Sequence, residues 1–508
     1  MSHTVLQVIP RYFFLLLSLL STCPYIADAQ FLLTKESPVR RASAPEKLAQ
    51  AITYQTVSVV NGHHQNGEEF LALHNYLREA FPVVHQHLQS ETVNDYSLLY
   101  TWQGKDASLK PVLISAHLDV VPVEAATKRD WSMMPFEGQI QDGYVWGRGT
   151  MDDKYRVVAI LEAVERLLVN GFRPNRTVYL AFGHDEEVGG YNGAGKISKV
   201  LEERGVQLEV VFDEGLAVAE DVIPGVKGQL ALVGMAAKGN VNLKLTVHGE
   251  GGHSSVPPNQ TPIDILSMAL VRLQENPFEP RMTPTTRETL EVLADKMGGK
   301  YKFAVRHYGL FKNRILKMLA QDQATDALIR TKMTPTIFEA GDKYNVLPRV
   351  ASAVVNVRIL NGEDINTVMK HITESIADER VRVEVYGSYT PPTAVTPSNT
   401  WIYAALQNAI SDVFPDALVV PALFPGATDS RHYGNLTSNI FRFAPQVVNR
   451  ESATLIHNVN EKIALDVFAG CIRFYETLLQ YTCSEVFTQQ FVRKGNYTIG
   501  LPAGLLVD

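Results

Sequence analysis

The segment DDKYRVVAILEAVERLLVNG (residues 152–171) has the apolar spacing of a long amphipathic helix, and Gly171 is suited to end it. An apolar run lies on either side of it, PVLISAH (111–117) before and TVYLAF (177–182) after, and each is typical of a buried strand. Strand, helix and strand in this order form the βαβ unit of a parallel sheet. The segment therefore predicts an α/β fold in which helices cover a mainly parallel sheet.

The same alternation extends in both directions from this unit. Upstream, apolar residues at positions 70, 73 and 77 form a helical stripe. Downstream, a helix is expected near 196–204 and a strand at LEVVF (208–212). The parallel sheet thus continues to about residue 236.

From about residue 237 the pattern changes. NVNLKLTVHG (240–249) alternates like a half-exposed strand, and a longer helical stretch is expected at roughly 285–330. ASAVVNVRIL (351–360) and VRVEVYG (381–387) then indicate strands of a separate antiparallel sheet. We interpret this region as an α+β domain inserted into the first one.

The domain organisation predicted from these patterns has six segments. They are a signal peptide at 1–29, an extended lead-in at 30–50, a catalytic domain in two parts at 51–236 and 388–483, the inserted domain at 237–387, and a C-terminal tail at 484–508 to which the sequence assigns no role.

Composition excludes some classes of protein. The chain has 508 residues, of which 45% are hydrophobic and 20% charged, and its net charge is −7. These values are ordinary for a globular protein, and the acidic balance argues against a nucleic-acid partner, which would favour a basic surface.

The N-terminus resembles a secretory signal. FFLLLSLLSTCPYI (13–26) is apolar but short for a membrane span, and Ala27 to Ala29 form an A-x-A cleavage pattern before Gln30. The prediction is a secreted chain without stable membrane insertion, and an uncleaved signal anchor is the alternative. Four N-x-S/T sequons, at Asn175, Asn259, Asn435 and Asn496, are consistent with secretion.

The cysteines do not predict a disulfide-stabilised fold. Cys23 would be removed with the signal, which leaves Cys471 and Cys483. If both lie on one helix, twelve residues separate them by about 18 Å. That separation is beyond the reach of a disulfide bond.

Acidic residues and histidines follow the strands of the first domain. His117 and Asp119 follow one strand, Asp185 to Glu187 follow the next, and Asp213 and Glu214 follow a third, while Asp152 precedes the long helix. Ligands of open parallel sheets bind beyond the carboxyl ends of the strands, so these side chains are expected to converge.

Taken singly, each of these residues has a structural interpretation. His117 could be a core histidine, Asp152 a helix cap, and the acidic segments solvated turns. Together, the histidines and carboxylates form the mixture of nitrogen and oxygen ligands that suits zinc. No G-x-S-x-G motif supports a serine hydrolase instead.

Seven motifs occur in the order found in one known family. They are HLD (117–119), GRGTMDDK (147–154), DEEVGG (185–190), DEG (213–215), GHSS (252–255), PGATDSR (425–431) and IHNVNEKI (456–463). Over residues 45–482 the chain resembles the co-catalytic zinc family of aminoacylases, glutamate carboxypeptidases and yeast-type Gly-X carboxypeptidases. The signal and the long insertion resemble its secreted branch, which acts on N-fatty-acyl amino acids.

The resemblance implies two zinc ions per chain and a role for each motif residue. His117 would bind the first zinc, Glu187 and His457 the second, Asp152 would bridge them, and the remaining ligand would be Glu214 or, alternatively, Asp213. Asp119 would orient His117, and Glu186 would be the general base.

The resemblance also assigns roles outside the metal centre. His253 would stabilise the oxyanion, Asn345 and Arg358 would bind substrate, and Gly426 and Arg431 would line the pocket. The inserted domain would be a lid and dimerisation domain, and association with lipoproteins is implied as well.

The predicted function is hydrolysis, and reversibly synthesis, of N-acyl amino acids, with a carboxypeptidase acting on dipeptides and small peptides as the alternative. A non-catalytic carrier on the same fold is a further alternative, which the presence of Glu186 beside the ligands argues against.

Overall fold

The computed structural model describes residues 42–59, 66–221, 226–294 and 296–485. The predicted signal peptide, the sequon at Asn496 and nearly all of the C-terminal tail lie outside the described residues.

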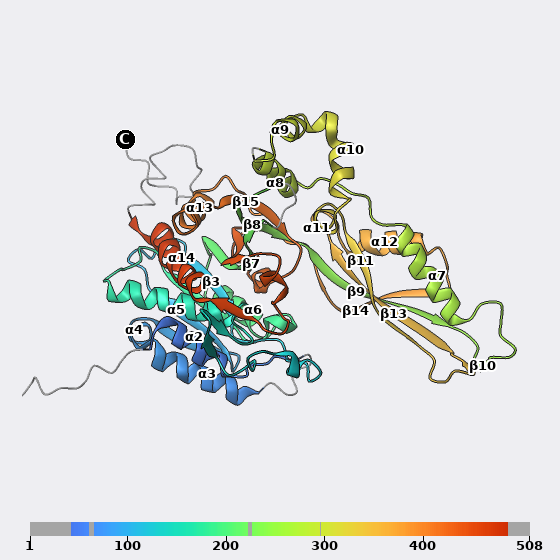
Figure 1. Cartoon of the computed structure of the whole chain (residues 1–508), viewed down its shortest axis with the longest axis horizontal. Helices are drawn as coiled ribbons and strands as arrows, with labels where there is room; N and C mark the ends of the chain where they lie inside the picture. Colours follow the sequence, from blue (N-terminus) through green and yellow to red (C-terminus); the bar gives the residue numbers. More distant parts are fainter. Residues whose placement is uncertain (1–41, 60–65, 222–225, 295, 486–508) are drawn as a thin grey trace, which may run out of the picture. The chain divides into compact units, whose positions relative to one another are not determined.

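A mixed eight-stranded sheet forms the core of the catalytic domain (Figure 1). Its strands, in spatial order, are β1 (Gln89–Val93), β2 (Ser97–Trp102), β6 (Val178–Gly183), β3 (Val112–His117), β7 (Val210–Glu220), β16 (Ile440–Val448), β8 (Gln229–Ala237) and β15 (Leu418–Phe424). The pairs β6–β3, β3–β7, β7–β16 and β8–β15 are parallel, whereas β1 and β2 are antiparallel to their neighbours. The predicted α/β class with a mainly parallel sheet is confirmed.

Helices cover both faces of this sheet because its central strands are apolar on both sides. On one side the main core packs against α2 (Ala44–Ile52), α3 (Gly67–Ala80), α4 (Pro82–His87), α5 (Lys154–Val169), α13 (Trp401–Val413) and α14 (Leu465–Cys483). On the other side lie α6 (Ala194–Glu203) and the short helix η3 (Asp429–Tyr433). Alternation along β3 sends Ile114 into the first core and Leu113 into the second.

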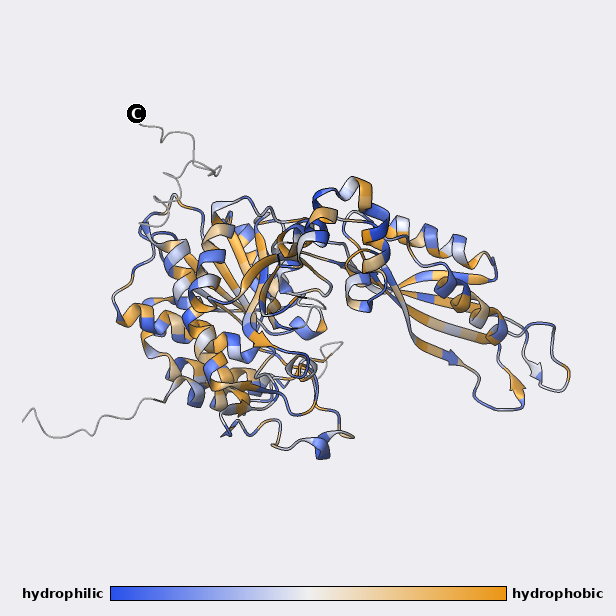
Figure 2. Cartoon of the chain, turned by 45° about the horizontal axis from the view of Figure 1, so that its top comes forward, coloured by the Kyte–Doolittle hydropathy of each residue, from blue (hydrophilic) through white to orange (hydrophobic). Residues whose placement is uncertain are grey.

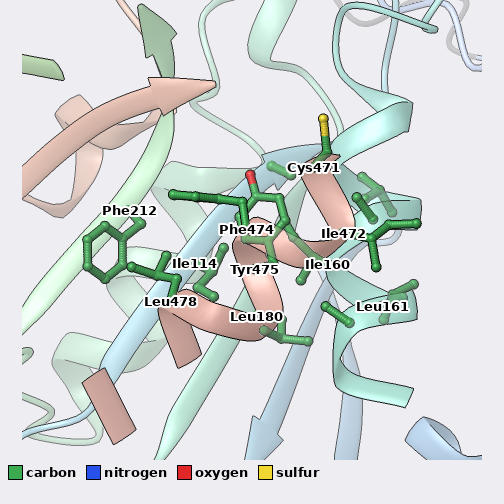
Figure 3. Packing of buried hydrophobic residues seen from close by; sticks show 14 of the residues in the cluster. Ile114, Ile160, Leu161, Leu180, Phe212, Cys471, Ile472, Phe474, Tyr475 and Leu478 are labelled. Atoms are coloured by element: carbon green, nitrogen blue, oxygen red, sulfur yellow. The ribbon is translucent and has the colours of Figure 1, made fainter. Parts of the chain in front are cut away.

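The main core is centred on α14. Figure 3 shows Phe474, Tyr475 and Leu478 of this helix beside Ile114 of β3 and Phe212 of β7. Hydrophobic colouring in Figure 2 follows the strands, while the surrounding helices carry hydrophilic residues along their outer sides. The two cysteines of α14, Cys471 and Cys483, are buried and free, as the helix spacing predicted.

Short elements complete the catalytic domain at the ends of the strands. They are β4 (Gln139–Gln141), β5 (Tyr144–Trp146) and β17 (Lys462–Ala464), which form a three-stranded sheet, and the short helices η1 (Lys128–Asp130), η2 (Glu186–Val188) and η4 (Ser452–Thr454).

The inserted domain contains a four-stranded antiparallel sheet. Its strands are, in order, β11 (Lys332–Ala340), β13 (Val350–Ile359), β9 (Gly239–His248) and β14 (Val381–Thr390), and α7 (Pro262–Glu275) and α12 (Ile365–Ile376) pack on one face (Figure 1). A small two-stranded antiparallel sheet of β10 (Gly252–His253) and β12 (Val346–Leu347) accompanies it.

The stretch expected to be helical at 285–330 forms four helices. They are α8 (Pro284–Ala294), α9 (Gly299–Arg306), α10 (Tyr308–Leu319) and α11 (Gln323–Ala327). Helix α8 packs on β15, and Thr289 Oγ1 donates a 2.6 Å hydrogen bond to the carbonyl of Pro421. This part of the insertion therefore covers an edge strand of the catalytic sheet.

The two crossings between the domains lie side by side. Thr393 N donates to the carbonyl of Ala237 at 3.1 Å, and Ala237 N donates to Thr393 Oγ1 at 2.8 Å. Strand β14 runs to Thr390, so the structure continues the inserted sheet three residues past the predicted boundary at 387.

The prediction of an extended lead-in at 30–50 is wrong for its last residues, because Ala44–Ile52 is helical. Leu48 and Ile52 are fully buried in the main core, and Lys47 forms a 2.7 Å ion pair with Glu162 of α5. The segment is helical because its apolar side packs on α5. It is too short to show a helical period in the sequence. Within the described residues, no helix combines the length and apolarity needed to cross a membrane.

Candidate metal centre and active site

Five side chains meet at the carboxyl ends of β3 and β6, beside the register shift in the middle of β7. His117 is the last residue of β3, Glu187 lies in η2 directly after β6, and Glu214 lies within β7. Asp152 precedes α5, and His457 lies in the loop before β17. The chain brings these residues together from positions 340 residues apart because parallel strands end at one edge of the sheet.

The Asp152 carboxylate lies between the two histidines. Its Oδ1 is 3.0 Å from His117 Nε2, and its Oδ2 is 3.0 Å from His457 Nε2. Each oxygen therefore faces a different imidazole, so this carboxylate has room to serve as a ligand on either side.

Each histidine has a further carboxylate beside it. Glu214 Oε1 lies 3.7 Å from His117 Nε2, and Glu187 Oε1 lies 3.1 Å from His457 Nε2. The cluster thus divides into two overlapping sets that share Asp152, one with His117 and Glu214 and one with Glu187 and His457. Imidazole nitrogens and carboxylate oxygens at this spacing fit a pair of divalent ions, zinc included.

The geometry separates the two residues between which the sequence left the ligand open. Asp213 Oδ2 accepts a 2.7 Å hydrogen bond from Ser430 N, and its Oδ1 lies 3.9 Å from the guanidinium of Arg156. Because neighbours on a strand face opposite ways, Glu214 points towards His117 while Asp213 is held by these partners. Glu214 is the better placed ligand.

A glycine after Glu214 allows the strand to deform at this point. The register of β7 against β16 shifts between Asp213 and Leu216, and Gly215 has φ +148°. A Cβ on Gly215 would lie 2.6 Å from the Cβ of Arg442. Only glycine satisfies both constraints.

Asp119 joins two parts of the site. It lies beside His117, whose Nδ1 is 3.3 Å from Asp119 Oδ1, and Ser58 Oγ donates a 2.6 Å hydrogen bond to Oδ2. The backbone amides of Glu186 and Glu187 also donate to its two oxygens, at 3.1 and 3.2 Å. One buried carboxylate therefore orients the imidazole of His117 and the turn that carries the acidic pair.

Glu461 is a further residue of the site, and the sequence motifs did not identify its role. It is fully buried, its Oε1 accepts hydrogen bonds from the amides of Gly149 and Met151 at 2.9 and 2.8 Å, and its Oε2 accepts one from Arg148. It lies four residues after His457, so it ties the loop of that histidine to the loop that carries Asp152. The signal in the sequence was its place at the end of IHNVNE (456–461).

The electrostatics of the cluster reflect crowded carboxylates. Burial and nearby carboxylates raise the pKa of Glu214 and Glu186 well above the usual range. Hydrogen bonds to Asp152 and Glu187 raise the pKa of His457 to about 10. Burial favours the neutral form of Asp152, but hydrogen bonds to the two histidines hold its pKa below the usual range. Cations among these groups would stabilise the ionised carboxylates.

Glu186 differs from the residue beside it. Its carboxylate lies within ligand distance of His117 and Glu214, but in the part of the chain that the structure describes no hydrogen bond to this carboxylate is recorded. Glu187 is instead oriented by His457. Glu186 is thus available to exchange a proton.

The remaining candidates lie around the cluster or on the inserted domain. His253 is exposed on β10, with Nδ1 2.7 Å from Ser255 Oγ, and Asn345 accepts a 3.2 Å hydrogen bond from Ser254 N through its backbone carbonyl. No contact recorded among the described residues joins His253 to the metal cluster.

The charge of Arg431 acts on Arg358. Burial and the charge of Arg431 lower the pKa of Arg358, which lies half-buried on β13. Arg431 donates a 2.5 Å hydrogen bond to the carbonyl of Gly189, two residues after Glu187. Gly426 lies where a Cβ would be 2.8 Å from the ring of Phe424.

Comparisons with known proteins identify the family of the chain. The model of Peptidase family M20/M25/M40 matches residues 113–481. The chain is 39% identical over 454 residues to the N-fatty-acyl-amino acid synthase/hydrolase PM20D1 of Xenopus tropicalis, with 88% of each chain covered. It is 39% identical over 441 residues to the probable carboxypeptidase S-like 2 of Dictyostelium discoideum, with 86% of this chain and 84% of the relative covered.

Solved structures share the fold at low sequence identity. The M20 family metallo-carboxypeptidase Sso-CP2 of Sulfolobus solfataricus superposes with a TM-score of 0.64 at 18% identity, covering 86% of this chain and 99% of that one. Human carnosine dipeptidase 1 gives a TM-score of 0.60 at 15% identity, covering 86% and 95%. The family match spans most of the chain and includes every residue of the cluster, so this protein belongs to peptidase family M20/M25/M40 and is a metallohydrolase of that family.

Proposed function

We propose that the chain is a secreted di-zinc amidohydrolase that hydrolyses, and in reverse synthesises, N-fatty-acyl amino acids. The observation that carries the proposal is the arrangement of Asp152 between two histidines, with the unbonded carboxylate of Glu186 beside them. The choice of substrate is supported by the relative from Xenopus tropicalis, which is named for this activity. The match covers 88% of the length of that relative.

Two zinc ions would be held by the overlapping sets already described, His117, Asp152 and Glu214 for one and Asp152, Glu187 and His457 for the other. When bound, the ions would supply Lewis acidity that polarises the amide carbonyl and activates water.

The protein's own groups then perform the proton transfers. Glu186 takes the proton from the attacking water and delivers it to the nitrogen of the leaving amino acid. In the direction of synthesis the same carboxylate accepts the proton from the attacking amine and returns it to the oxygen that leaves the fatty acid as water. Asp119 keeps His117 and the turn of Glu186 in place through its hydrogen bonds.

The free carboxylate of the amino acid requires a cationic partner. Arg358 and Arg431 are proposed to bind it, because a guanidinium can hold a carboxylate with two parallel hydrogen bonds and the charge of Arg431 acts on Arg358. Asn345 would bind substrate beside them. His253 would donate to the developing oxyanion, from the second subunit of a homodimer.

A carboxypeptidase that cleaves dipeptides and small peptides is the second candidate. The relative from Dictyostelium discoideum, named carboxypeptidase S-like, favours it at the same 39% identity. Both reactions break an amide next to a free carboxylate, so the proposed machinery serves either one, and the acyl side of the substrate distinguishes them.

The test uses the chain purified from the medium of expressing cells. Its zinc content is measured, and hydrolysis of N-oleoyl-phenylalanine is compared with hydrolysis of a dipeptide panel. We expect about two zinc ions per chain and a higher kcat/KM for the fatty-acyl substrate. Faster cleavage of dipeptides would establish the carboxypeptidase instead.

The adjacent glutamates provide a matched pair of variants. Glu186→Gln keeps size and hydrogen bonding but cannot accept a proton, so activity should fall by about 10²–10⁴-fold with both ions retained. Glu187→Gln removes an anionic ligand, so one zinc ion should bind more weakly. Loss of zinc from the Glu186 variant alone would reverse the two assignments.

A further inference from the structure

We propose that a pocket between α8, α9 and α10 binds one long-chain carboxylate molecule, with the hydrocarbon chain inside and the carboxylate at its cationic rim. The site is separate from the metal cluster, and its ligand is inferred from the pocket's own shape and charge. It therefore goes beyond the proposed function and does not depend on it.

The cavity has the size of a small-molecule site. Its volume is about 710 Å³, and apolar side chains, including Leu290 of α8, Phe303 of α9 and Ile315 and Met318 of α10, form its wall. Ligand pockets typically measure about 300–1,000 Å³. Phe303 and Met318 remain 55% and 39% exposed, so apolar surface is available for a ligand to cover.

The apolar wall is supported by a core of its own. Leu290 and Val305, which line the pocket, are buried in one cluster with Leu316 and Leu319 of α10. Because this core holds the three helices against each other, the cavity is a feature of the fold at this point.

The rim carries an unusual concentration of positive charge. From residue 296 to residue 321 the sequence contains seven Lys and Arg residues and no Asp or Glu, although the whole chain has a net charge of −7. Three of the seven, Lys300, Arg314 and Lys317, line the pocket. Among the described residues, none of these three forms an ion pair with a carboxylate.

An apolar cavity with several unpaired cations at its edge is complementary to an anionic amphiphile. A guanidinium can hold a carboxylate with two parallel hydrogen bonds, and each methylene that enters the cavity strengthens binding by about fourfold. Nucleic acid would not use the apolar wall, and a neutral lipid would not use the cations. A single long-chain carboxylate uses both.

The test is a fluorescence titration of the zinc-loaded full-length protein with cis-parinaric acid, followed by displacement with hexadecanoate, dodecanoate and hexadecanol. We expect one saturable site per chain, with hexadecanoate displacing the probe at least tenfold more effectively than dodecanoate or hexadecanol. Equal displacement by all three competitors would overturn the proposal.

Charge variants locate the site. The double variant Arg314→Glu, Lys317→Glu should weaken probe binding at least tenfold, whereas Lys312→Glu, an exposed position of the same helix that does not line the pocket, should leave it unchanged. Both should retain the melting temperature and the hydrolysis of a short-chain N-acetyl amino acid. An equal loss of probe binding in the two variants would mean a general effect of charge and would overturn the proposed site.

Two further measurements keep the outcomes distinct. Glu186→Gln should bind the probe like the unaltered chain, so the pocket is tested even if the proposed hydrolysis is not found. Binding to phosphatidylglycerol vesicles without one-to-one binding of the probe would assign the basic helices to a lipid surface instead, and would overturn the single-molecule site.

Discussion

At the scale of residues, the sequence predicted which side chains gather but not how they are held. His117, Asp152, Glu187 and His457 were selected by motif, and the structure brings them within 3.1 Å of a neighbour in the cluster. The choice between Asp213 and Glu214 needed the pleat and bulge of β7, which no spacing in the sequence reveals. The role of Glu461 was not predicted because its partners are mainly backbone amides, and the sequence does not show which amides lie beside a side chain.

Glu461→Gln tests the connection between the two ligand loops. The substitution leaves Arg148 buried without a counter-charge, which costs about 3–5 kcal/mol of folding free energy. We also expect weaker zinc binding, because the loops of Asp152 and His457 lose their link. Competition with a chelator measures zinc affinity at a temperature where the variant is folded.

The control for this variant is Glu451→Gln, an exposed position in the same region of the chain. It should change neither stability nor zinc affinity. If Glu461→Gln lowered stability but bound zinc with unchanged affinity, Glu461 would have a purely structural role.

His74 gives a pH dependence that lies outside the metal centre. Burial lowers its pKa to about 4 from a usual value of 6.5, and its Nε2 lies 2.9 Å from the carbonyl of Tyr96. As the pH falls, His74 takes up a proton near pH 6.5 in the unfolded chain but only near pH 4 in the folded chain. Its contribution to the free energy of unfolding is therefore complete above pH 6.5 and declines towards pH 4.

The measurement is the melting temperature of the unaltered chain and of His74→Gln between pH 7.5 and about 5. We expect the difference between the two melting temperatures to narrow as the pH falls. His87→Gln, at an exposed histidine, is the control and should show a constant difference. A difference that widened in acid would contradict the assignment.

At the scale of elements, periodicity predicted the structures that have a continuous apolar side. The helix expected at 152–171 is α5 (Lys154–Val169), and the strand expected at 177–182 is β6 (Val178–Gly183). Helix α2 was missed because nine residues offer little periodicity, and its helical form depends on packing against α5. Strand β7 runs to Glu220, beyond the predicted 212, because β16 and β8 pair with its second half.

Helix α14 should contribute strongly to stability. Leu478 is 1% exposed in the main core, so Leu478→Ala should lower the free energy of unfolding by about 2–5 kcal/mol. Leu71→Ala on α3, at a leucine that is 49% exposed, should cost less than about 0.5 kcal/mol. Urea denaturation followed by circular dichroism measures both, and equal effects would refute the central place of α14 in the core.

At the scale of the whole molecule, the insertion was predicted from a change of strand pattern near residue 237. The hydrogen bonds between Ala237 and Thr393 mark the two crossings in the structure. The packing of α8 on β15 could not be predicted, because the contact joins residues that are 132 positions apart and no motif marks it. The place of His253, Asn345 and Arg358 within the insertion, by contrast, follows from its predicted bounds at 237–387, and the structure has them on β10, directly before β12 and on β13.

Secretion predicts a specific set of modifications. The mature chain should begin near Gln30, and glycans should be attached first at Asn259 and Asn435, because both are exposed while Asn175 is half-buried. N-terminal sequencing and the mass shift after glycosidase treatment of protein from the medium measure this. A retained apolar N-terminal segment would establish a membrane anchor.

The position of α14 at the end of the described chain has a consequence for synthesis. At about 5–20 residues per second, the interval between Glu220 and Cys483 lasts roughly 13–50 s. Throughout it, the apolar side of α5 is on the ribosome without α14, the helix that packs against it in the main core. A message truncated directly before α14 therefore yields a chain that has every predicted metal ligand but aggregates, and not a smaller enzyme.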